Sequence, residues 1–169
     1  MSKLAARNGP IQPGGQQMNE LIKPIMATPP GAGTGKRILV VDDNLVILKV
    51  LSNVLKSNGY EVLTATDGSK AISTVRREKL DLILLDLNFP PDVGTGGGVP
   101  WDGFLIMDWL RRMDEGTGIP IIVITSEEPA KSDQRALAAG VLKVFHKPLD
   151  HEALLAAIRE VLGQNSPTP

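Results

Sequence analysis

Polar side chains able to do chemistry follow four apolar runs of this sequence, close to the point where each run ends. Asp42 and Asp43 come directly after one run, and Asp86 comes directly after a second. Thr125 follows a third run, and Lys147 stands two residues beyond a fourth. If the runs are parallel strands of one sheet, their carboxyl ends share the edge at which open α/β sheets bind ligands. The sequence therefore predicts one site containing three carboxylates, a hydroxyl and an amine.

Metal-assisted phosphoryl transfer is the chemistry that such a site favours. Three converging, partly desolvated carboxylates repel one another and persist only with a counter-cation. Oxygen ligands without histidine or cysteine select a hard ion, and Mg²⁺ is the usual choice. Beside that ion, Asp86 would attack phosphorus while Thr125 and Lys147 bind the phosphoryl oxygens. Taken singly, each residue is as well explained as a turn or helix-cap residue, so the prediction depends on the combination.

The hydrophobic pattern predicts the elements that position these residues. The runs ILVV, LILL and IIVI, and the shorter run Val141–Phe145, are typical of strands buried on both faces. Between the runs, apolar residues recur at three- and four-residue steps, as in the set Leu45, Leu48, Leu51 and Leu55. Five strands and five helices in alternation predict an α/β domain with helices on both faces of the sheet. The second predicted strand ends without a residue that could take part in this chemistry, so we expect this strand at an edge of the sheet.

Composition excludes several other classes of protein. The 169 residues are 42% apolar and 22% charged, as in globular domains, and the net charge of −1 gives no general attraction to nucleic acid or anionic membrane. With no cysteine and only two histidines, thiolate chemistry is excluded and a histidine-built zinc site is disfavoured. There is no apolar stretch of membrane-spanning length and no signal-peptide core, so we expect a soluble, cytoplasmic protein.

The predicted folded unit covers residues 36–163. Residues 1–35 contain five prolines and only scattered apolar side chains, so we expect a flexible N-terminal extension. Residues 164–169 are expected to be a disordered tail. Nothing resembling a DNA-binding or enzymatic output domain follows Gly163.

The predicted site resembles that of the receiver domain of two-component response regulators. The motifs that carry the resemblance are, in chain order, Asp42-Asp43, Asp86 with Pro90, Thr125, and Lys147-Pro148. Together with the alternation of strands and helices, they extend the resemblance over residues 36–162. It implies a flavodoxin-like, doubly wound five-stranded parallel sheet of order 2-1-3-4-5 with five helices. It also implies phosphoryl transfer from the phosphohistidine of a partner kinase to Asp86.

The resemblance implies a role for each motif residue. Asp86 would be the phosphoacceptor, and Thr125 and Lys147 would bind the phosphoryl oxygens. The implied ligands of Mg²⁺ are Asp42 (mainly through water), Asp43, Asp86 and the backbone carbonyl of Asn88. The Lys147–Pro148 peptide bond is expected to be cis.

Two departures from the family pattern bear on mechanism. The segment Pro91–Pro100 is an insertion before Asp102-Gly103, and we leave two interpretations open: a tolerated surface loop, or a lid or partner contact beside the site. Val144 occupies the position that the family usually gives to a switch aromatic residue, and strand alternation points Phe145 to the opposite face. We therefore expect activation through backbone or loop movement.

These features predict a stand-alone, phosphorylation-controlled signalling module that is not a turnover enzyme. Its expected partners are a sensor histidine kinase or phosphotransfer protein and a downstream protein target, with no direct binding to nucleic acid or membrane. The fourth helix, fifth strand and fifth helix form the implied surface for a homodimer or a target. A receiver that works within a larger regulator or hybrid kinase is a second interpretation.

A rival class is the Mg²⁺-dependent phosphatase or phosphotransferase of the haloacid-dehalogenase type, which also uses an aspartate nucleophile, Thr or Ser, and Lys. That family places a second aspartate two residues after its nucleophile, usually at the first strand. Here Asn88 occupies the corresponding position, and Asp86 follows the third predicted strand. Turnover of a phosphate ester would distinguish this rival from a receiver.

Overall fold

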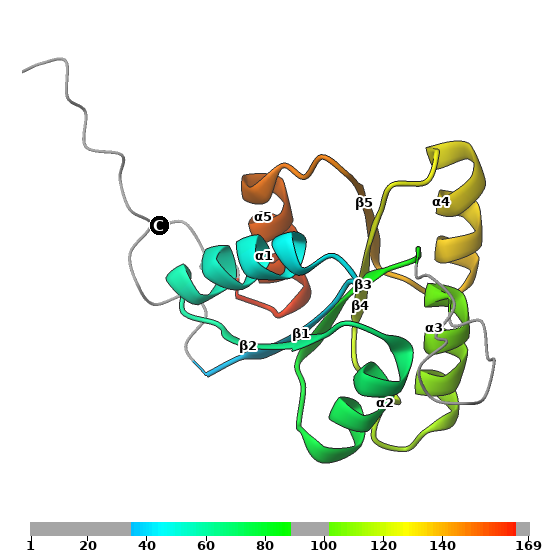
Figure 1. The fold of residues 1–169 in the computed structure, drawn as a ribbon, viewed down its shortest axis with the longest axis horizontal. Helices are drawn as coiled ribbons and strands as arrows, with labels where there is room; N and C mark the ends of the chain where they lie inside the picture. The colour runs from blue at the N-terminus through cyan, green and yellow to red at the C-terminus, as the bar shows by residue number, and fades with distance from the viewer. Residues whose placement is uncertain (1–34, 89–101, 165–169) are drawn as a thin grey trace, which may run out of the picture.

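Five short parallel strands form the centre of the computed structural model, which describes residues 35–88 and 102–164 (Figure 1). The strands are β1 (Arg37–Val41), β2 (Glu61–Ala65), β3 (Leu82–Asp86), β4 (Ile121–Thr125) and β5 (Lys143–His146). Their order in the sheet is β2-β1-β3-β4-β5, and each neighbouring pair is parallel. The predicted flavodoxin-like α/β fold is confirmed, and β2 lies at an edge of the sheet as expected.

The helices cover both faces of the sheet. They are α1 (Leu45–Ser57), α2 (Gly68–Arg77), α3 (Gly103–Arg112), α4 (Pro129–Ala138) and α5 (His151–Val161). In Figure 1, α1 and α5 lie on one side of the sheet, and α2, α3 and α4 lie on the other. The helices thus alternate with the strands in the way that the sequence predicts.

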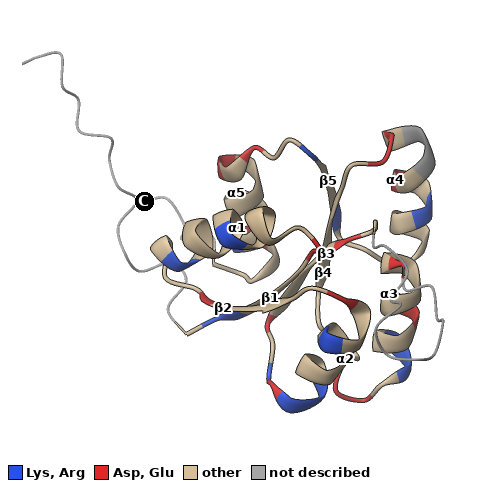
Figure 2. Cartoon of the chain, in the orientation of Figure 1, with Lys and Arg blue, Asp and Glu red and all other residues tan. Residues whose placement is uncertain are grey.

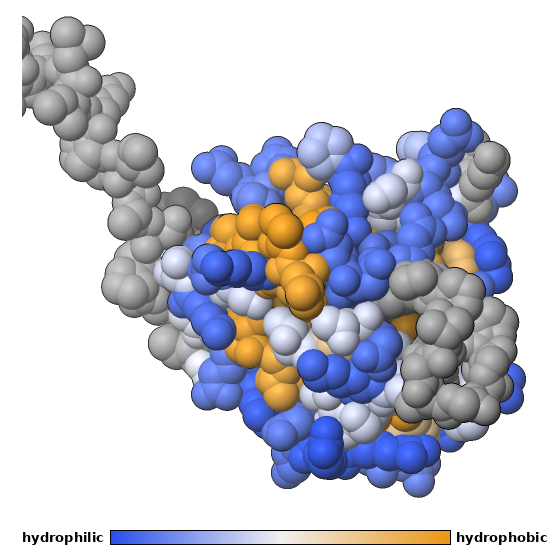
Figure 3. Space-filling view, in the orientation of Figure 1, coloured by the Kyte–Doolittle hydropathy of each residue, from blue (hydrophilic) through white to orange (hydrophobic). Residues whose placement is uncertain are grey.

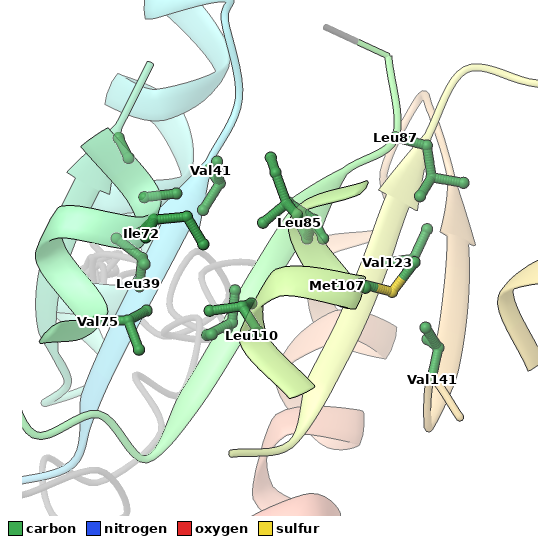
Figure 4. Packing of buried hydrophobic residues seen from close by; sticks show 14 of the residues in the cluster. Leu39, Val41, Ile72, Val75, Leu85, Leu87, Met107, Leu110, Val123 and Val141 are labelled. Carbon is green, nitrogen blue, oxygen red and sulfur yellow. The ribbon is translucent and has the colours of Figure 1, made fainter. Parts of the chain in front are cut away.

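Two apolar cores hold the sheet between these helix layers. Successive residues of β3 alternate between them, so that Leu84 packs toward α1 and α5. Leu85 packs toward α2 and α3 (Figure 4). The side chains of Leu82–Leu85 are all fully buried. Because close-packed interiors resist compression, the strand ends have fixed positions on which a polar site can be built.

Capping residues define both ends of helix α1. The side-chain oxygen of Asn44 accepts hydrogen bonds from the backbone N–H groups of Val46 (2.9 Å) and Ile47 (3.4 Å), which caps the first turn. Gly59 follows the helix with φ +84°, a conformation that favours glycine. The expected apolar repeat holds for Leu48, Leu51 and Leu55 but not for Leu45, which is 69% exposed. Leu45 is the first residue of the helix.

Strand β5 begins later than the apolar run that predicts it. The N–H of Val141 donates to the carbonyl of Ala136, so that Val141 belongs to the end of α4 and not to the sheet. Gly140 follows the end of α4 with φ +74°, a conformation that favours glycine. The strand therefore extends from Lys143 to His146, and Lys147 follows directly after its last residue.

Several predictions concern segments outside the described residues. They are the N-terminal extension up to residue 34, the insertion Pro91–Pro100 together with Pro90, and the tail from residue 165. Within residues 35–88 and 102–164, no helix combines the length and the apolar character that crossing a membrane requires.

Candidate functional site

The sheet brings the predicted site residues together at its carboxyl edge. Asp42 follows β1, while Asp86 and Thr125 are the last residues of β3 and β4. The strand register aligns Asp86 with Ile124 of the neighbouring strand, so these ends are level. Carboxylate oxygens of Asp42, Asp43 and Asp86 all lie within 4.8 Å of one another. Figure 2 shows acidic segments meeting near the middle of the molecule, where β1 and β3 end.

Lys147 bridges the two buried carboxylates of this cluster. Its Nζ donates to Oδ2 of Asp42 and to Oδ2 of Asp86, and both distances are 2.7 Å. The exposed fractions of the three side chains are 16% for Lys147, 2% for Asp42 and 4% for Asp86. Short charge-assisted bonds between groups this well buried are much stronger than surface ion pairs.

Backbone donors hold the second oxygen of each buried carboxylate. The N–H of Asn44 donates to Oδ1 of Asp42 (2.8 Å), and the N–H of Asn88 donates to Oδ1 of Asp86 (3.0 Å). Each acid is therefore held through one oxygen by the chain two residues on and through the other by Lys147. Asp43 is exposed, and its carboxylate has no hydrogen-bond or ion-pair partner within the described parts of the chain.

The pKa values of the central pair follow from this environment. Burial raises the pKa of Asp86, and the nearby charge of Asp42 adds to the rise. The hydrogen bonds from Lys147 and from the Asn88 N–H offset only part of it. Burial alone would lower the pKa of Lys147, but its hydrogen bonds to Asp42 and Asp86 and their charges outweigh burial and raise it. Lys147 is thus held in its charged form.

Thr125 is fully buried beside this pair and is held by its neighbours in the chain. Its Oγ1 accepts a hydrogen bond from the N–H of Glu127 (3.1 Å), and its carbonyl accepts one from the N–H of Lys147 (2.8 Å). The Lys147–Pro148 peptide bond is cis, as expected. Val144 and Phe145 pack into opposite cores, which confirms that the ring of Phe145 lies on the other face of the sheet.

Gly103 explains a sequence feature whose role residue patterns alone did not define. A Cβ at this position would lie 2.5 Å from the carbonyl oxygen of Asp86 and 2.7 Å from the Cα of Leu87, both backbone atoms. The N–H of Gly103 donates to the carbonyl of Leu87 (3.1 Å), and Asp102 caps α3 by accepting from the N–H of Leu105 (2.7 Å). The start of α3 therefore packs directly against the backbone that carries Asp86.

An open hollow of about 450 Å³ adjoins the acidic cluster, and the sequence did not reveal it. Its lining includes Asp43 and Asn88 from the strand ends, and Phe104 and Arg135 from α3 and α4. The guanidinium carbon of Arg135 lies 3.6 Å from the centre of the Phe104 ring. No periodicity or motif links these two residues, because their contact depends on how the two helices pack.

The residues present fit a divalent hard cation. Three carboxylates approach one another, and among the described residues the ammonium of Lys147 is the one positive charge paired with them. This leaves an excess of negative charge in a partly buried place, with oxygen atoms as the only ligands on offer. Oxygen ligands of this kind suit hard divalent cations, of which Mg²⁺ is one.

Comparison with solved structures places the fold in the CheY-like class of flavodoxin folds. The chemotaxis protein CheY4 of Vibrio cholerae is 30% identical with a TM-score of 0.65, and the match covers 75% of this chain and 98% of that one. The receiver domain of the sensor histidine kinase PA1611 from Pseudomonas aeruginosa is 30% identical with a TM-score of 0.65, covering 77% and 99%. That structure has a magnesium ion coordinated in its active site cleft.

Sequence comparison defines the family. The family described as the response regulator receiver domain matches residues 38–159. The transcriptional regulatory protein GlrR of Escherichia coli is 32% identical over 130 residues, which are 77% of this chain and 27% of GlrR. The DNA-binding response regulator MtrA of Mycobacterium tuberculosis is 31% identical over 134 residues, which are 79% of this chain and 54% of MtrA. The chain belongs to the response regulator receiver domain family, and it spans only part of these curated relatives.

Proposed function

We propose that this protein accepts a phosphoryl group on Asp86 from the phosphohistidine of a sensor kinase or phosphotransfer protein. The single observation that carries the proposal is the pairing of Asp86 with Lys147 at 2.7 Å inside a cluster of three carboxylates. Phosphorylation would then change the affinity for a partner protein. The protein acts as its own substrate in this reaction and turns over no other phosphate compound, so it is not a classical enzyme.

The chain's own residues supply the chemistry of transfer. A carboxylate oxygen of Asp86 attacks phosphorus, the P–O bond forms as the P–N bond of the phosphohistidine breaks, and the donor histidine leaves as imidazole. Lys147 already contacts Asp86, so its ammonium is placed to bind a phosphoryl oxygen. The hydroxyl of Thr125, on the neighbouring strand, binds another.

Mg²⁺ would be held by Asp43 and Asp86, by the backbone carbonyl of Asn88, and by Asp42 mainly through water. When bound, the ion neutralises charge on the carboxylates and on the transferring phosphoryl group. The exposure of Asp43 and its lack of a partner among the described residues support a direct role, because it can bind the ion without losing an existing bond.

The donor protein has an apolar surface to contact beside the site. Asp86 is only 4% exposed, so a donor histidine can reach it only if the donor covers the rim of the carboxyl edge. On that rim, the first turns of α1 expose Leu45, Val46 and Val50 (Figure 3). We assign the contact with the kinase or phosphotransfer protein to this surface.

The output surface is proposed to be the face formed by α4, β5 and α5, used by a second copy or by a target protein. Exposed Leu137 and Leu142 lie on α4 and just before β5 and support an apolar contact there. We further propose a cytoplasmic location and no direct contact of this domain with nucleic acid. No observation favours the dehalogenase-type alternative.

Intact-mass measurement after incubation with acetyl phosphate and Mg²⁺ tests the proposal. The wild-type protein should gain about 80 Da, the mass of one phosphoryl group. Asp86→Asn should abolish the gain because an amide is not a nucleophile here, whereas Asp114→Asn, an exposed matched control, should retain it. Chelation of Mg²⁺ should suppress it. A gain that survives Asp86→Asn, or the absence of a gain with acetyl phosphate and with a histidine kinase, would refute the proposal.

A further inference from the structure

His146 joins the strand that carries Lys147 to a helix on the surface. It is the last residue of β5, and the register of the sheet aligns it with Thr125 of β4. Its side chain is 30% exposed and lies between the β4–α4 loop and α4. The proposed phosphotransfer reaction gives His146 no part.

Each ring nitrogen of His146 has its own partner. Nδ1 lies 3.0 Å from the carbonyl oxygen of Glu127, in the loop that follows β4. Nε2 lies 3.0 Å from Oδ1 of Asp133, in α4. A carbonyl and a carboxylate only accept hydrogen bonds, so each contact is a hydrogen bond where the ring nitrogen concerned carries hydrogen. The ring is therefore a two-ended link between loop and helix.

The loop end of this link leads back to the phosphorylation site. Glu127, whose carbonyl meets His146, donates its N–H to Oγ1 of Thr125 (3.1 Å). The Thr125 hydroxyl has one hydrogen to donate and can accept from more than one donor. If the Thr125 oxygen itself moves toward a phosphoryl group, the Glu127 N–H must follow it or lose its acceptor. A displacement of this oxygen therefore acts on the backbone of Glu127, whose carbonyl faces His146.

The helix end leads to the proposed output surface. Oδ1 of Asp133 also accepts from the hydroxyl of Ser132 (3.1 Å), and Ser132 is fully buried against the rest of the domain. Asp133 itself is partly exposed, at 38%. A change at His146 is thus transmitted to a residue that anchors the first turns of α4. Val144 and Phe145 pack into the two apolar cores and make no comparable polar link.

We propose that His146 is a positioning residue that transmits the movement of the Thr125 hydroxyl to α4 through Glu127 and Asp133. The inference rests on the proposed function, because it requires a phosphoryl group at Asp86 to draw the hydroxyl away. In the unphosphorylated state, the link holds the loop and α4 together. In the phosphorylated state, the displaced Glu127 carbonyl releases one end of the link, and α4 shifts relative to β5.

Backbone amide NMR of ¹⁵N-labelled protein tests this link, with beryllofluoride and Mg²⁺ as a stable phosphoryl mimic. In the wild type, resonances of the loop (126–128) and of α4 (132–138) should both shift, and the ring nitrogens of His146 should shift with them. In His146→Ala the loop shifts should persist and the α4 shifts should be lost. Asp133→Asn cuts the same link from the helix side and should give the same pattern. His151→Ala, at the start of α5, removes the chain's other histidine and should behave as wild type.

Intact-mass measurement with acetyl phosphate separates this inference from the proposed function. Both link variants should still accept one phosphoryl group, because neither residue contacts Asp86. Full α4 shifts in His146→Ala and Asp133→Asn, or unchanged ring resonances of His146 in the wild type, would overturn the inference alone. Loss of phosphorylation in the link variants would place His146 in the transfer reaction and would also overturn it. A wild-type protein that takes no phosphoryl group would overturn both proposals.

Discussion

Replacing Lys147 by methionine should destabilise the unphosphorylated protein more than any ordinary surface substitution. Methionine preserves most of the apolar stem but removes the ammonium that bridges Asp42 and Asp86. Two carboxylates that are 2% and 4% exposed then face each other without their common partner. Their Oδ1 atoms retain the backbone hydrogen bonds from Asn44 and Asn88, so the loss is confined to the Oδ2 side.

The size of the effect follows from the two bonds lost. A hydrogen bond to a charged group contributes about 1.5–3 kcal/mol, and breaking a buried ion pair costs about 3–5 kcal/mol. Asp86 already has a raised pKa and can relieve part of the cost by binding a proton. We therefore expect a loss of about 3 kcal/mol at neutral pH without Mg²⁺, which lowers the Tm of a domain of this size by roughly 10 °C.

Urea unfolding followed by circular dichroism measures this loss, and two further variants identify its cause. Lys143→Met is the matched control, because Lys143 also lies in β5 but pairs with Glu160 at the surface. Its cost should stay below about 1 kcal/mol. In the double variant Asp86→Asn with Lys147→Met, one of the two unpaired charges is gone. The double variant should therefore recover about 1–2 kcal/mol relative to Lys147→Met alone.

Three outcomes would refute this reasoning. Lys147→Met could match Lys143→Met in stability, which would mean that the bridge contributes no more than a surface pair. The double variant could be as unstable as Lys147→Met, which would mean that unpaired carboxylates are not the cause. Mg²⁺ could fail to restore stability to Lys147→Met, although a cation should replace the missing positive charge.

Three more predictions follow from the site. Gly103→Ala should cost about 1–3 kcal/mol in urea unfolding and should slow phosphorylation by acetyl phosphate, because its Cβ would meet the backbone of Asp86 and Leu87; wild-type stability would refute the close packing. The folded pKa of Asp86 lies above its ordinary value of 3.8, so the stability that it contributes at low pH is lost as pH rises through the folded pKa. Urea titrations should therefore show Asp86→Asn gaining stability relative to wild type from acid to neutral pH, and a constant difference would contradict this. Mg²⁺ at about 100 times its Kd should stabilise the wild type by about 2.7 kcal/mol in the same assay, and Asp43→Asn should lose most of this gain; an equal gain in both would exclude Asp43 as a ligand.

The sequence was sufficient to predict the sheet and the residues at its carboxyl edge. Parallel strands buried on both faces leave a strong apolar signal, and their carboxyl ends necessarily share one edge. Asp42, Asp86 and Thr125 could be brought together on that argument alone, since each lies at or directly after a strand end. The position of Lys147 was harder to predict, because the apolar run before it starts two residues ahead of β5.

Contacts that depend on helix packing could not be predicted in this way. The stacking of Arg135 on Phe104 and the pairing of His146 with Asp133 each join elements whose relative rotation no local pattern specifies. The role of Gly103 also depends on a distance between two backbones, which appears in the sequence only as a glycine. The exposure of Leu45 shows the same limit, because helical periodicity identifies a face of the helix but not which of its residues the fold buries.

The position of Lys147 connects the electrostatics of the site to its proposed signal. In the described chain, three carboxylates and one bridging ammonium leave a net of two negative charges at the carboxyl edge. A phosphoryl group on Asp86 adds further negative charge, so Lys147 is drawn from Asp42 toward the phosphoryl oxygens. The N–H of Lys147 donates to the carbonyl of Thr125, and His146 precedes it in the chain. The two groups proposed to bind the phosphoryl oxygens are therefore joined by one backbone contact, and a displacement of either one acts on the strand end to which α4 is linked.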